Sequence, residues 1–236
     1  MKLGFLTATP AKGRLAGLVL TLLLPVIPQA IGETSVPMGK PVYELTGDVR
    51  LFHGYSAGTL AAGREVVVWL VPTQTTQEAR LNSELPHYRM IHHHKIFEPR
   101  LLVVPVGAVV EFPNYDPWFH NVFSNRFDLG LYGPGAQRAV RFDRAGASYL
   151  FCSLHPETMG IVLTVDSKYF GVSDKTGHLS IGKVPSGTYI LHVWYENATP
   201  QALEALRRVI FVGDDSRSLP SISVALFNRI PLTGRN

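Results

Sequence analysis

The sequence predicts an all-β protein, and two observations favour strands over helices. The chain of 236 residues contains 21 Gly and 17 Pro, more than long helices tolerate. Short alternating runs of Val, Ile, Tyr and Phe recur between turn residues, as half-buried strands require. With 46% hydrophobic and 17% charged residues, the chain has enough apolar material for the core of a globular protein.

The first 32 residues have the pattern of an export signal. Lys2, Lys12 and Arg14 accompany an uncharged stretch over residues 15–31 that is rich in Leu and Val. This stretch contains two prolines and is shorter than the roughly 20 residues that span a bilayer. We therefore expect a signal peptide over residues 1–32, a periplasmic or extracellular mature protein, and no integral membrane span after cleavage.

The charge balance excludes nucleic acid as a partner. The chain has 22 basic and 18 acidic residues, and three of the basic ones lie in the signal segment, which leaves a net charge of +1. Because no basic run is present either, the mature chain lacks the electrostatic footprint that binds a phosphate backbone. The single cysteine, Cys152, has no partner for an intramolecular disulfide.

The predicted strands form three groups along the mature chain. The first group lies at residues 42–52 and 64–71, and its second strand carries the dense run Val-Val-Val-Trp-Leu. Residues 72–89 are polar and without pattern, which indicates a boundary. The second group is predicted at residues 100–104, 108–112, 137–142, 148–152 and 161–165, and the third at 169–173, 178–181, 188–195, 209–212 and 221–227. A short helix is predicted from Pro200 to Arg208, because proline suits a first helical turn.

Three potential metal ligands follow a predicted strand within eight residues: Cys152, His155 and Met159. A turn there brings a thiolate, an imidazole and a thioether to one point. Two imidazoles, one thiolate and a weak axial methionine form the donor set of a blue-copper electron-transfer centre. The second imidazole is expected from His120, which follows another strand in the run His-Asn-Val-Phe-Ser. The sequence thus predicts one copper ion, cycling between Cu(I) and Cu(II).

Further motifs surround these residues between positions 87 and 167. They are Phe-Glu-Pro at 97–99, the turn at 104–107, the segments 111–114 and 127–130, the run at 120–124, and Cys-x-x-His followed by a methionine. On these motifs the stretch resembles the cupredoxin family, particularly secreted cupredoxin-like proteins of the methylamine-utilisation type. The resemblance implies a Greek-key β-sandwich in which His120, Cys152 and His155 are the equatorial copper ligands and Met159 is the axial one.

The same resemblance implies how the site is held and how electrons leave it. Asn121 and Ser153 are expected to tie the two ligand loops together by hydrogen bonds. His155 is expected to be the electron port, facing a redox partner protein that the sequence does not identify. The apolar surface around this port is expected from Pro113, Trp118, Phe119, Leu154 and Pro156.

Two turn motifs mark the third group of strands, Asp-x-x-Gly at 174–177 and Val-Pro-x-Gly-x-Tyr at 184–189. Each is expected to make a hairpin turn. On these motifs the stretch 170–194 resembles the carboxypeptidase regulatory-like, transthyretin-like β-sandwich family. Residues 47–49 and 65–70 fill the places of that family's first two strands.

These resemblances predict a discontinuous arrangement of domains. Residues 41–72 and 168–227 are expected to form one transthyretin-like sandwich, and the cupredoxin domain, residues 80–167, is expected to be inserted between its second and third strands. A simple tandem of two domains is the alternative.

Other polar residues allow a functional and a structural interpretation. His92, His93 and His94, with His87, offer a second metal site, but three successive strand residues point to alternate faces, which favours a polar loop or edge strand. Asp116 and Glu157 flank the predicted copper ligands and are expected to be solvated loop carboxylates, not general acids.

The ligand pattern therefore predicts an exported electron-transfer protein with one type 1 copper ion. The alternative is a copper-binding carrier or adhesion module without a redox partner. The sequence shows neither the two-cysteine loop of a binuclear copper centre nor the ligand pairs of multicopper oxidases, so we expect no enzymatic activity.

Overall fold

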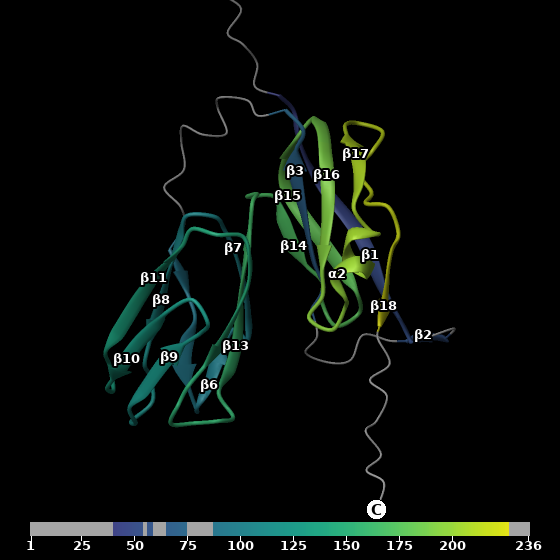
Figure 1. Ribbon diagram of the computed structural model, residues 1–236. Helices are drawn as coiled ribbons and strands as arrows, with labels where there is room; N and C mark the ends of the chain where they lie inside the picture. Colours follow the sequence, from purple (N-terminus) through teal and green to yellow (C-terminus); the bar gives the residue numbers. More distant parts are fainter. Residues whose placement is uncertain (1–39, 54–55, 59–64, 75–86, 227–236) are drawn as a thin grey trace, which may run out of the picture. The chain divides into compact units, whose positions relative to one another are not determined.

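The structure is a computed structural model that describes residues 40–53, 56–58, 65–74 and 87–226 (Figure 1). The predicted signal segment lies outside the described residues, as does most of the boundary stretch. Within the described part, regular structure consists of strands and one short helix, α2 (Pro200–Glu204). The predicted all-β class is confirmed. No helix in this part of the chain is long and apolar enough to cross a membrane.

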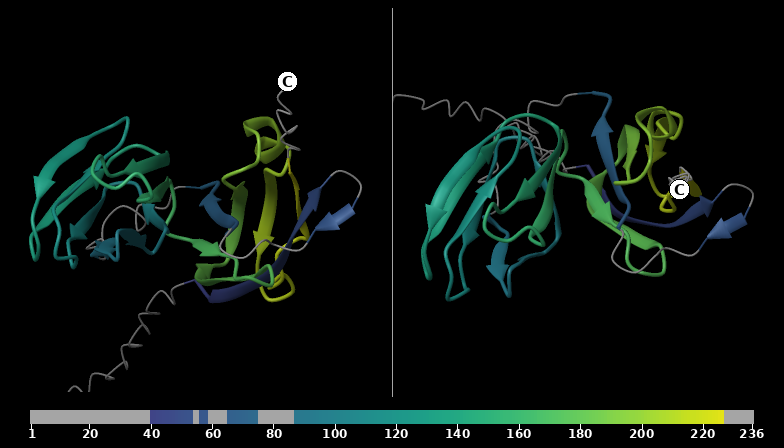
Figure 2. Two further views of the ribbon diagram at one scale, coloured as in Figure 1. Left: turned by 90° about the horizontal axis from the view of Figure 1, so that it is seen from below. Right: turned by 60° about the horizontal axis from the view of Figure 1, so that its bottom comes forward.

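Strands from the beginning and the end of the described chain share two sheets. One sheet has the order β15-β1-β18, with β2 paired to β1, and the other has the order β14-β3-β16-β17. Their bounds are β1 (Val42–His53), β2 (Ser56–Gly58), β3 (Val67–Pro72), β14 (Phe170–Val172), β15 (His178–Pro185), β16 (Gly187–Trp194), β17 (Arg208–Val212) and β18 (Ile222–Leu226). Figure 2 shows β1 and β18 side by side, and the two strands pair in parallel.

Apolar side chains from both of these sheets meet in one buried core. Along β16, Tyr189, Leu191 and Val193 are buried in this core at every second position, as the two-residue period of a strand requires. The dense run of β3 has a different cause: Val68 faces this core, while Val67 belongs to another apolar cluster. Both faces of β3 are therefore buried, which explains why its sequence is continuously apolar.

The two turn motifs differ from the prediction, because they do not join paired strands. Asp174 accepts hydrogen bonds from the backbone N–H of Thr176 and of His178, as expected of an Asx turn. However, the strands on either side, β14 and β15, belong to different sheets, and so do β15 and β16 around Gly187. The predicted hairpins are wrong, since both turns carry the chain from one sheet to the other.

The strands between residues 88 and 165 pair with one another in three sheets. A five-stranded sheet has the order β10-β9-β12-β13-β7, a three-stranded sheet has the order β11-β8-β4, and β5 pairs with β6. Their bounds are β4 (Tyr88–Arg89), β5 (Ile91–His93), β6 (Ile96–Glu98), β7 (Leu101–Pro105), β8 (Ala108–Pro113), β9 (His120–Phe123), β10 (Asp128–Tyr132), β11 (Gln137–Phe142), β12 (Gly146–Phe151) and β13 (Met159–Val165). In Figure 1 they are the teal and blue-green strands.

A second core lies among these strands and includes Phe97, Phe112, Val122 and Leu150. The prediction missed five of the strands, β4, β5, β6, β9 and β10. The sequence of β9 starts with the polar pair His-Asn, and β10 is interrupted by Gly130, where φ is +65° and the pairing register shifts. Tertiary packing, not local pattern, makes these segments strands.

The helix α2 begins as predicted and ends four residues earlier, at Glu204. Thr199 caps it by accepting a hydrogen bond from the backbone N–H of Ala202 over 3.2 Å. The predicted domain boundaries at residues 72, 80 and 167 stay a prediction.

Candidate metal centre

The structure brings His120, Cys152 and His155 together. His120 opens β9, Cys152 follows the last residue of β12, and His155 lies in the loop that leads to β13. One ligand atom from each residue lies within 4.8 Å of the other two. His120 and Cys152 are buried, at 0% and 4% exposed, and His155 is partly buried. Two neighbouring strands and one loop thus deliver the three donors to one point.

The distances among the three donor atoms fit a metal ion. Sγ of Cys152 lies 3.7 Å from Nδ1 of His120 and 3.7 Å from Nδ1 of His155, and the two nitrogens are 3.1 Å apart. A triangle with these edges has a central point about 2 Å from each corner, close to the bond lengths of metal–imidazole and metal–thiolate pairs. Two borderline nitrogens and a soft sulfur favour copper, and the residues present fit that ion.

The carboxylate of Asp116 holds the candidate ligand His120 by its other ring nitrogen. Nε2 of His120 donates to Oδ2 of Asp116 over 2.9 Å, and the two side chains are 0% and 2% exposed. Because Nε2 carries the proton, Nδ1 keeps the lone pair that a metal needs. Burial lowers the pKa of His120 below its ordinary value, so the ring is neutral at physiological pH. The prediction of a solvated carboxylate at this position is wrong.

Asp116 also stabilises an unusual turn between β5 and β6. His94 and Lys95 have φ values of +53° and +60°, the left-handed conformation that a two-residue hairpin demands and that Asn-Gly normally fills. The backbone N–H groups of His94 and Lys95 donate to Oδ1 and Oδ2 of Asp116 over 2.6 and 2.8 Å. These bonds and that of His120 outweigh the effect of burial, which alone raises the pKa of Asp116, and keep this pKa below its ordinary value. One buried carboxylate therefore joins the turn to a candidate metal ligand.

The β5–β6 hairpin places His92 against the ring of His120. The two rings stack with centroids 4.2 Å apart and planes 10° apart, and His92 is 0% exposed. His92 also contacts Phe97, at a centroid distance of 4.1 Å with the ring planes tilted by 31°. Nδ1 of His92 lies 2.9 Å from the hydroxyl of Tyr132, whereas Nε2 has no hydrogen-bond partner among the described residues. Burial, and after it the nearby His120, lowers the pKa of His92 to about 3.

A third contact ties the two ligand segments to each other. Oδ1 of Asn121 accepts hydrogen bonds from the backbone N–H and the hydroxyl of Ser153, each over 2.8 Å. The predicted link between Asn121 and Ser153 is confirmed. Thr158, which is fully buried, donates to the carbonyl oxygen of Lys95 and so attaches the Cys152–Met159 loop to the β5–β6 turn. Hydrogen bonds from two different segments thus hold the loop that carries Cys152 and His155.

Met159 follows the loop that carries Cys152 and His155. It is the first residue of β13, pairs with Phe151 on β12 and is 41% exposed. Its role as the axial ligand stays a prediction. Glu157 is exposed, as expected of a solvated carboxylate.

Several exposed apolar side chains lie next to His120, Cys152 and His155 in the sequence. Trp118, Phe119 and Leu154 are 47%, 58% and 49% exposed. Pro156 is exposed as well, but Pro113 is buried at the end of β8, so its predicted place on the apolar surface is wrong.

The other histidines separate. The rings of His93 and His94 lie 3.8 Å apart between centroids, tilted by 31°, near the surface. His92 is buried against His120, and the side chain of His87 is 86% exposed beside Glu111. A single site shared by all of them is excluded, since His92 points away into the core.

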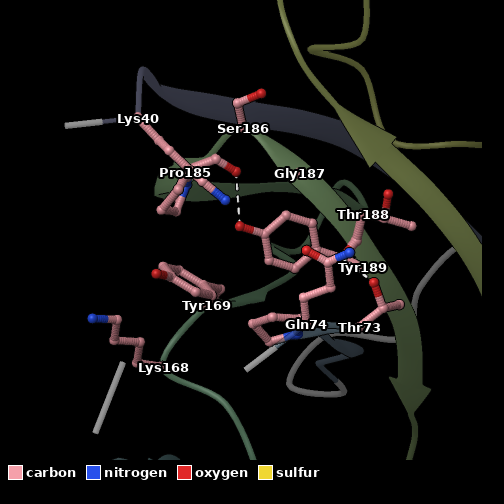
Figure 3. Close-up of a pocket in the computed structure, with 11 residues that line it drawn as sticks. Lys40, Thr73, Gln74, Lys168, Tyr169, Pro185, Ser186, Gly187, Thr188 and Tyr189 are labelled. Atoms are coloured by element: carbon pink, nitrogen blue, oxygen red, sulfur yellow. Dashed lines mark hydrogen bonds between the residues drawn. The ribbon is translucent and has the colours of Figure 1, made fainter. Parts of the chain in front are cut away.

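A cavity of about 370 Å³ lies elsewhere and contains none of the predicted metal ligands (Figure 3). Lys40 and Lys168 are its charged lining residues, and the hydroxyl of Tyr189 donates to the carbonyl oxygen of Pro185 over 2.7 Å. Burial raises the pKa of Tyr189 to about 12, which keeps this hydroxyl protonated.

Sequence reasoning missed His92, Tyr132 and Thr158 as parts of the centre. Each is polar and buried next to apolar residues, yet burial is not visible in a sequence. The sequence carries one signal of this burial. His92 is the middle residue of the short strand β5, and β5 leads toward the buried Phe97.

Comparison with models of protein families finds no match, and comparison with curated proteins finds none either. Several solved structures are similar to part of the chain. A purple cupredoxin from Nitrosopumilus maritimus is 23% identical over 33% of this chain and 99% of that one, with a TM-score of 0.32. A copper-containing nitrite reductase (NirK) from Thermus scotoductus SA-01 is 24% identical over 36% of this chain and 24% of that one, with a TM-score of 0.34. An amicyanin mutant in its Cu(I) form is 21% identical over 35% of this chain and 87% of that one, with a TM-score of 0.33.

Proposed function

We propose that this protein is an exported electron-transfer protein with one type 1 copper ion. His120, Cys152 and His155 hold the ion, and Met159 is its axial ligand. The observation that carries the proposal is the convergence of two Nδ1 atoms and one thiol sulfur at mutual distances of 3.1 to 3.7 Å. Once bound, copper supplies a one-electron couple between Cu(I) and Cu(II).

The chain's own contribution is to keep the donors in place in both oxidation states. Asp116 fixes the tautomer of His120, and Asn121 holds the segment that follows Cys152. Because these contacts are buried or partly buried hydrogen bonds, the donors move little when the charge of the ion changes. A site that moves little has a small reorganisation energy, which fast electron transfer requires.

The electron leaves through His155 in this proposal. His155 is partly buried, whereas His120 and Cys152 are almost completely buried. Leu154, Trp118 and Phe119 offer exposed apolar surface for a redox partner. Apolar contact of this kind suits a transient complex, because it forms without strong ion pairs that delay release.

The domain arrangement is part of the proposal. We infer that residues 41–72 and 168–227 form one transthyretin-like sandwich and that residues 80–167 form an inserted cupredoxin domain. Pairing of β1 with β15 and β18, and of β3 with β14 and β16, supports this division. Expression of residues 80–167 alone tests it: an inserted domain folds and binds copper without the flanking segments, and a chain that stays unfolded contradicts the division.

The copper centre is tested by the visible absorption spectrum of the mature protein loaded with Cu(II). We expect an intense blue, green or purple band from charge transfer between the Cys152 thiolate and copper. The band disappears in Cys152→Ala. The double variant His93→Ala, His94→Ala is the matched control and keeps the band, because these histidines are not ligands of the centre.

Voltammetry then separates electron transfer from copper carriage. An electron-transfer protein gives a reversible one-electron wave at a defined potential, whereas a carrier is reoxidised slowly and incompletely. A colourless wild-type protein that nevertheless holds copper contradicts the type 1 centre and makes Cys152 a buried structural residue.

A further inference from the structure

The β5–β6 hairpin lies directly behind the proposed copper ligand His120. Two contacts join the hairpin to His120: the stack of His92 on the His120 ring, and the carboxylate of Asp116 that binds both the turn and His120. A backbone bond from Tyr115 N–H to the His92 carbonyl oxygen over 2.9 Å also ties the hairpin to the segment before His120. Of these contacts only the stack touches the flat face of the ring.

The hydrogen bond to Asp116 alone leaves the His120 ring free to rotate about one axis. The bond from Nε2 to Asp116 restrains one edge of the imidazole, but rotation about the axis through that edge still changes where Nδ1 points. A parallel ring at 4.2 Å opposes this rotation, because the rotated ring would collide with it. His92 is itself packed against Phe97 and hydrogen-bonded to Tyr132, so it cannot yield.

We propose that His92 is a positioning residue for the copper centre: its buried ring, stacked on His120, fixes the plane in which His120 presents Nδ1 to the metal. This inference rests on the proposed copper function for its consequence, but the positioning itself is a property of the chain without metal. His92 touches no reacting atom. Its effect passes through the His120 ring.

The stacked face, not the nitrogen atoms, carries the positioning. Nε2 of His92 has no hydrogen-bond partner among the described residues, so only the bond between Nδ1 and the Tyr132 hydroxyl depends on a ring nitrogen. His92→Phe removes that bond and keeps the flat surface against His120, while His92→Ala removes both. Val193→Ala on β16 is the matched control for a cavity of moderate size, because Val193 is buried in the other core and β16 belongs to a different sheet from His120.

The first readout uses the metal-free full-length protein. In ¹H–¹⁵N spectra of the imidazole rings, we expect His120 to show one narrow set of signals with the proton on Nε2, in the wild type, in His92→Phe and in Val193→Ala. In His92→Ala the set is broadened or doubled, because the ring samples several orientations. A single narrow set in His92→Ala overturns the inference.

The second readout is the rate at which copper passes to an excess of chelator. Outer contacts of metal-bound histidines typically contribute 10–100-fold to affinity. We expect His92→Ala to release copper about 10–100-fold faster than the wild type, and His92→Phe and Val193→Ala to stay within about twofold. Equal acceleration in His92→Phe and His92→Ala also overturns the inference, since the stacked face would then be irrelevant. A wild type without a copper–thiolate band contradicts the proposed function instead, and the metal-free spectra still decide the role of His92.

Discussion

Nε2 of His120 donates a hydrogen bond to the carboxylate of Asp116 over 2.9 Å, and both side chains are buried. The same carboxylate accepts from two backbone N–H groups of a turn with left-handed residues. A buried anion is costly unless its oxygens are satisfied, and here three donors satisfy it. Asp116 thus contributes both to the stability of the fold and to the state of His120, the proposed metal ligand.

Asp116→Asn is expected to lower both the stability of the fold and the affinity for copper. An amide offers one oxygen where the carboxylate offers two, so at least one of the three donors loses its acceptor inside the protein. We expect the free energy of unfolding of the metal-free protein to fall by about 1–3 kcal/mol, and copper affinity to fall about 10–100-fold. Urea denaturation and chelator competition measure the two effects.

Asp143→Asn is the matched control for that change, because the Asp143 side chain is 63% exposed and, within the described part of the chain, pairs only with Arg141. We expect it to change the free energy of unfolding by less than about 0.5 kcal/mol. Copper affinity in Asp116→Asn equal to that of the control would contradict a role for Asp116 behind His120.

Asn121 and Ser153 allow a graded test of the link between the ligand segments. Ser153→Ala removes one of the two hydrogen bonds to Oδ1 of Asn121, whereas Asn121→Ala removes both. We expect copper to be released faster in the order wild type, Ser153→Ala, Asn121→Ala, with the last about 10–100-fold faster than the first. Stopped-flow transfer to a chelator gives the rates, and equal rates for the two variants would show that the backbone bond contributes nothing.

Gly171 and Gly182 form a pair that tests packing between the sheets of the other core. A methyl group at Gly171 on β14 would collide with the backbone carbonyl oxygen of Ser180, whereas one at Gly182 meets no described atom within 4 Å. We expect Gly171→Ala to lower the free energy of unfolding by about 1–3 kcal/mol, and Gly182→Ala to change it by less than about 0.5 kcal/mol. Coincident urea transitions for the two variants would refute the close approach of β14 to β15.

His192 is expected to make stability depend on pH. Its ring stacks on Trp69 with centroids 5.0 Å apart, and burial lowers its pKa from 6.5, against the opposing effect of Asp166. The unfolded chain therefore binds a proton at a higher pH than the folded protein does. The contribution of neutral His192 is complete above about pH 6.5 and is lost progressively as the pH falls toward the lowered pKa of the folded state.

The free energy of unfolding of metal-free protein, measured at about pH 7.5 and about pH 5.5, checks this expectation. The wild type loses more stability between these two values than His192→Gln, which keeps polarity but does not titrate. An identical loss in both proteins would assign the pH dependence to other groups.

Leu154→Glu tests the electron port without knowledge of the partner. Electron self-exchange between Cu(I) and Cu(II) copies of the protein requires two ports to meet, and a glutamate beside each adds repulsion between like charges. We expect self-exchange, measured by NMR line broadening, to slow by about tenfold while the copper–thiolate band is unchanged.

Val209→Glu serves as the control because it adds the same charge at an exposed position in a different sheet. Val209 is 66% exposed and lies on β17. It should leave the exchange rate close to that of the wild type. Equal slowing in the two variants would place the effect in net charge and not in a port around Leu154.

Much of the architecture could be predicted from local pattern. Strands such as β1, β8 and β11 can be recognised from alternating or apolar runs between turn residues, because each strand must bury one face regardless of its neighbours. Cys152, His155 and Met159 could be recognised together because all three lie in one loop, where spacing alone limits how far apart they can be. His120 needed the motif around it, since it lies 32 residues before Cys152 in the chain.

The surroundings of the ligands were decided by the tertiary structure. Asp116 was expected in solvent, yet the β5–β6 turn folds over it and buries its charge against three donors. His92 was expected in a polar edge strand, yet pairing of β5 with β6 turns it inward onto His120. The physical reason is that the side chain determines which chemistry a residue can perform, whereas its burial and its partners depend on which distant strands pack against it.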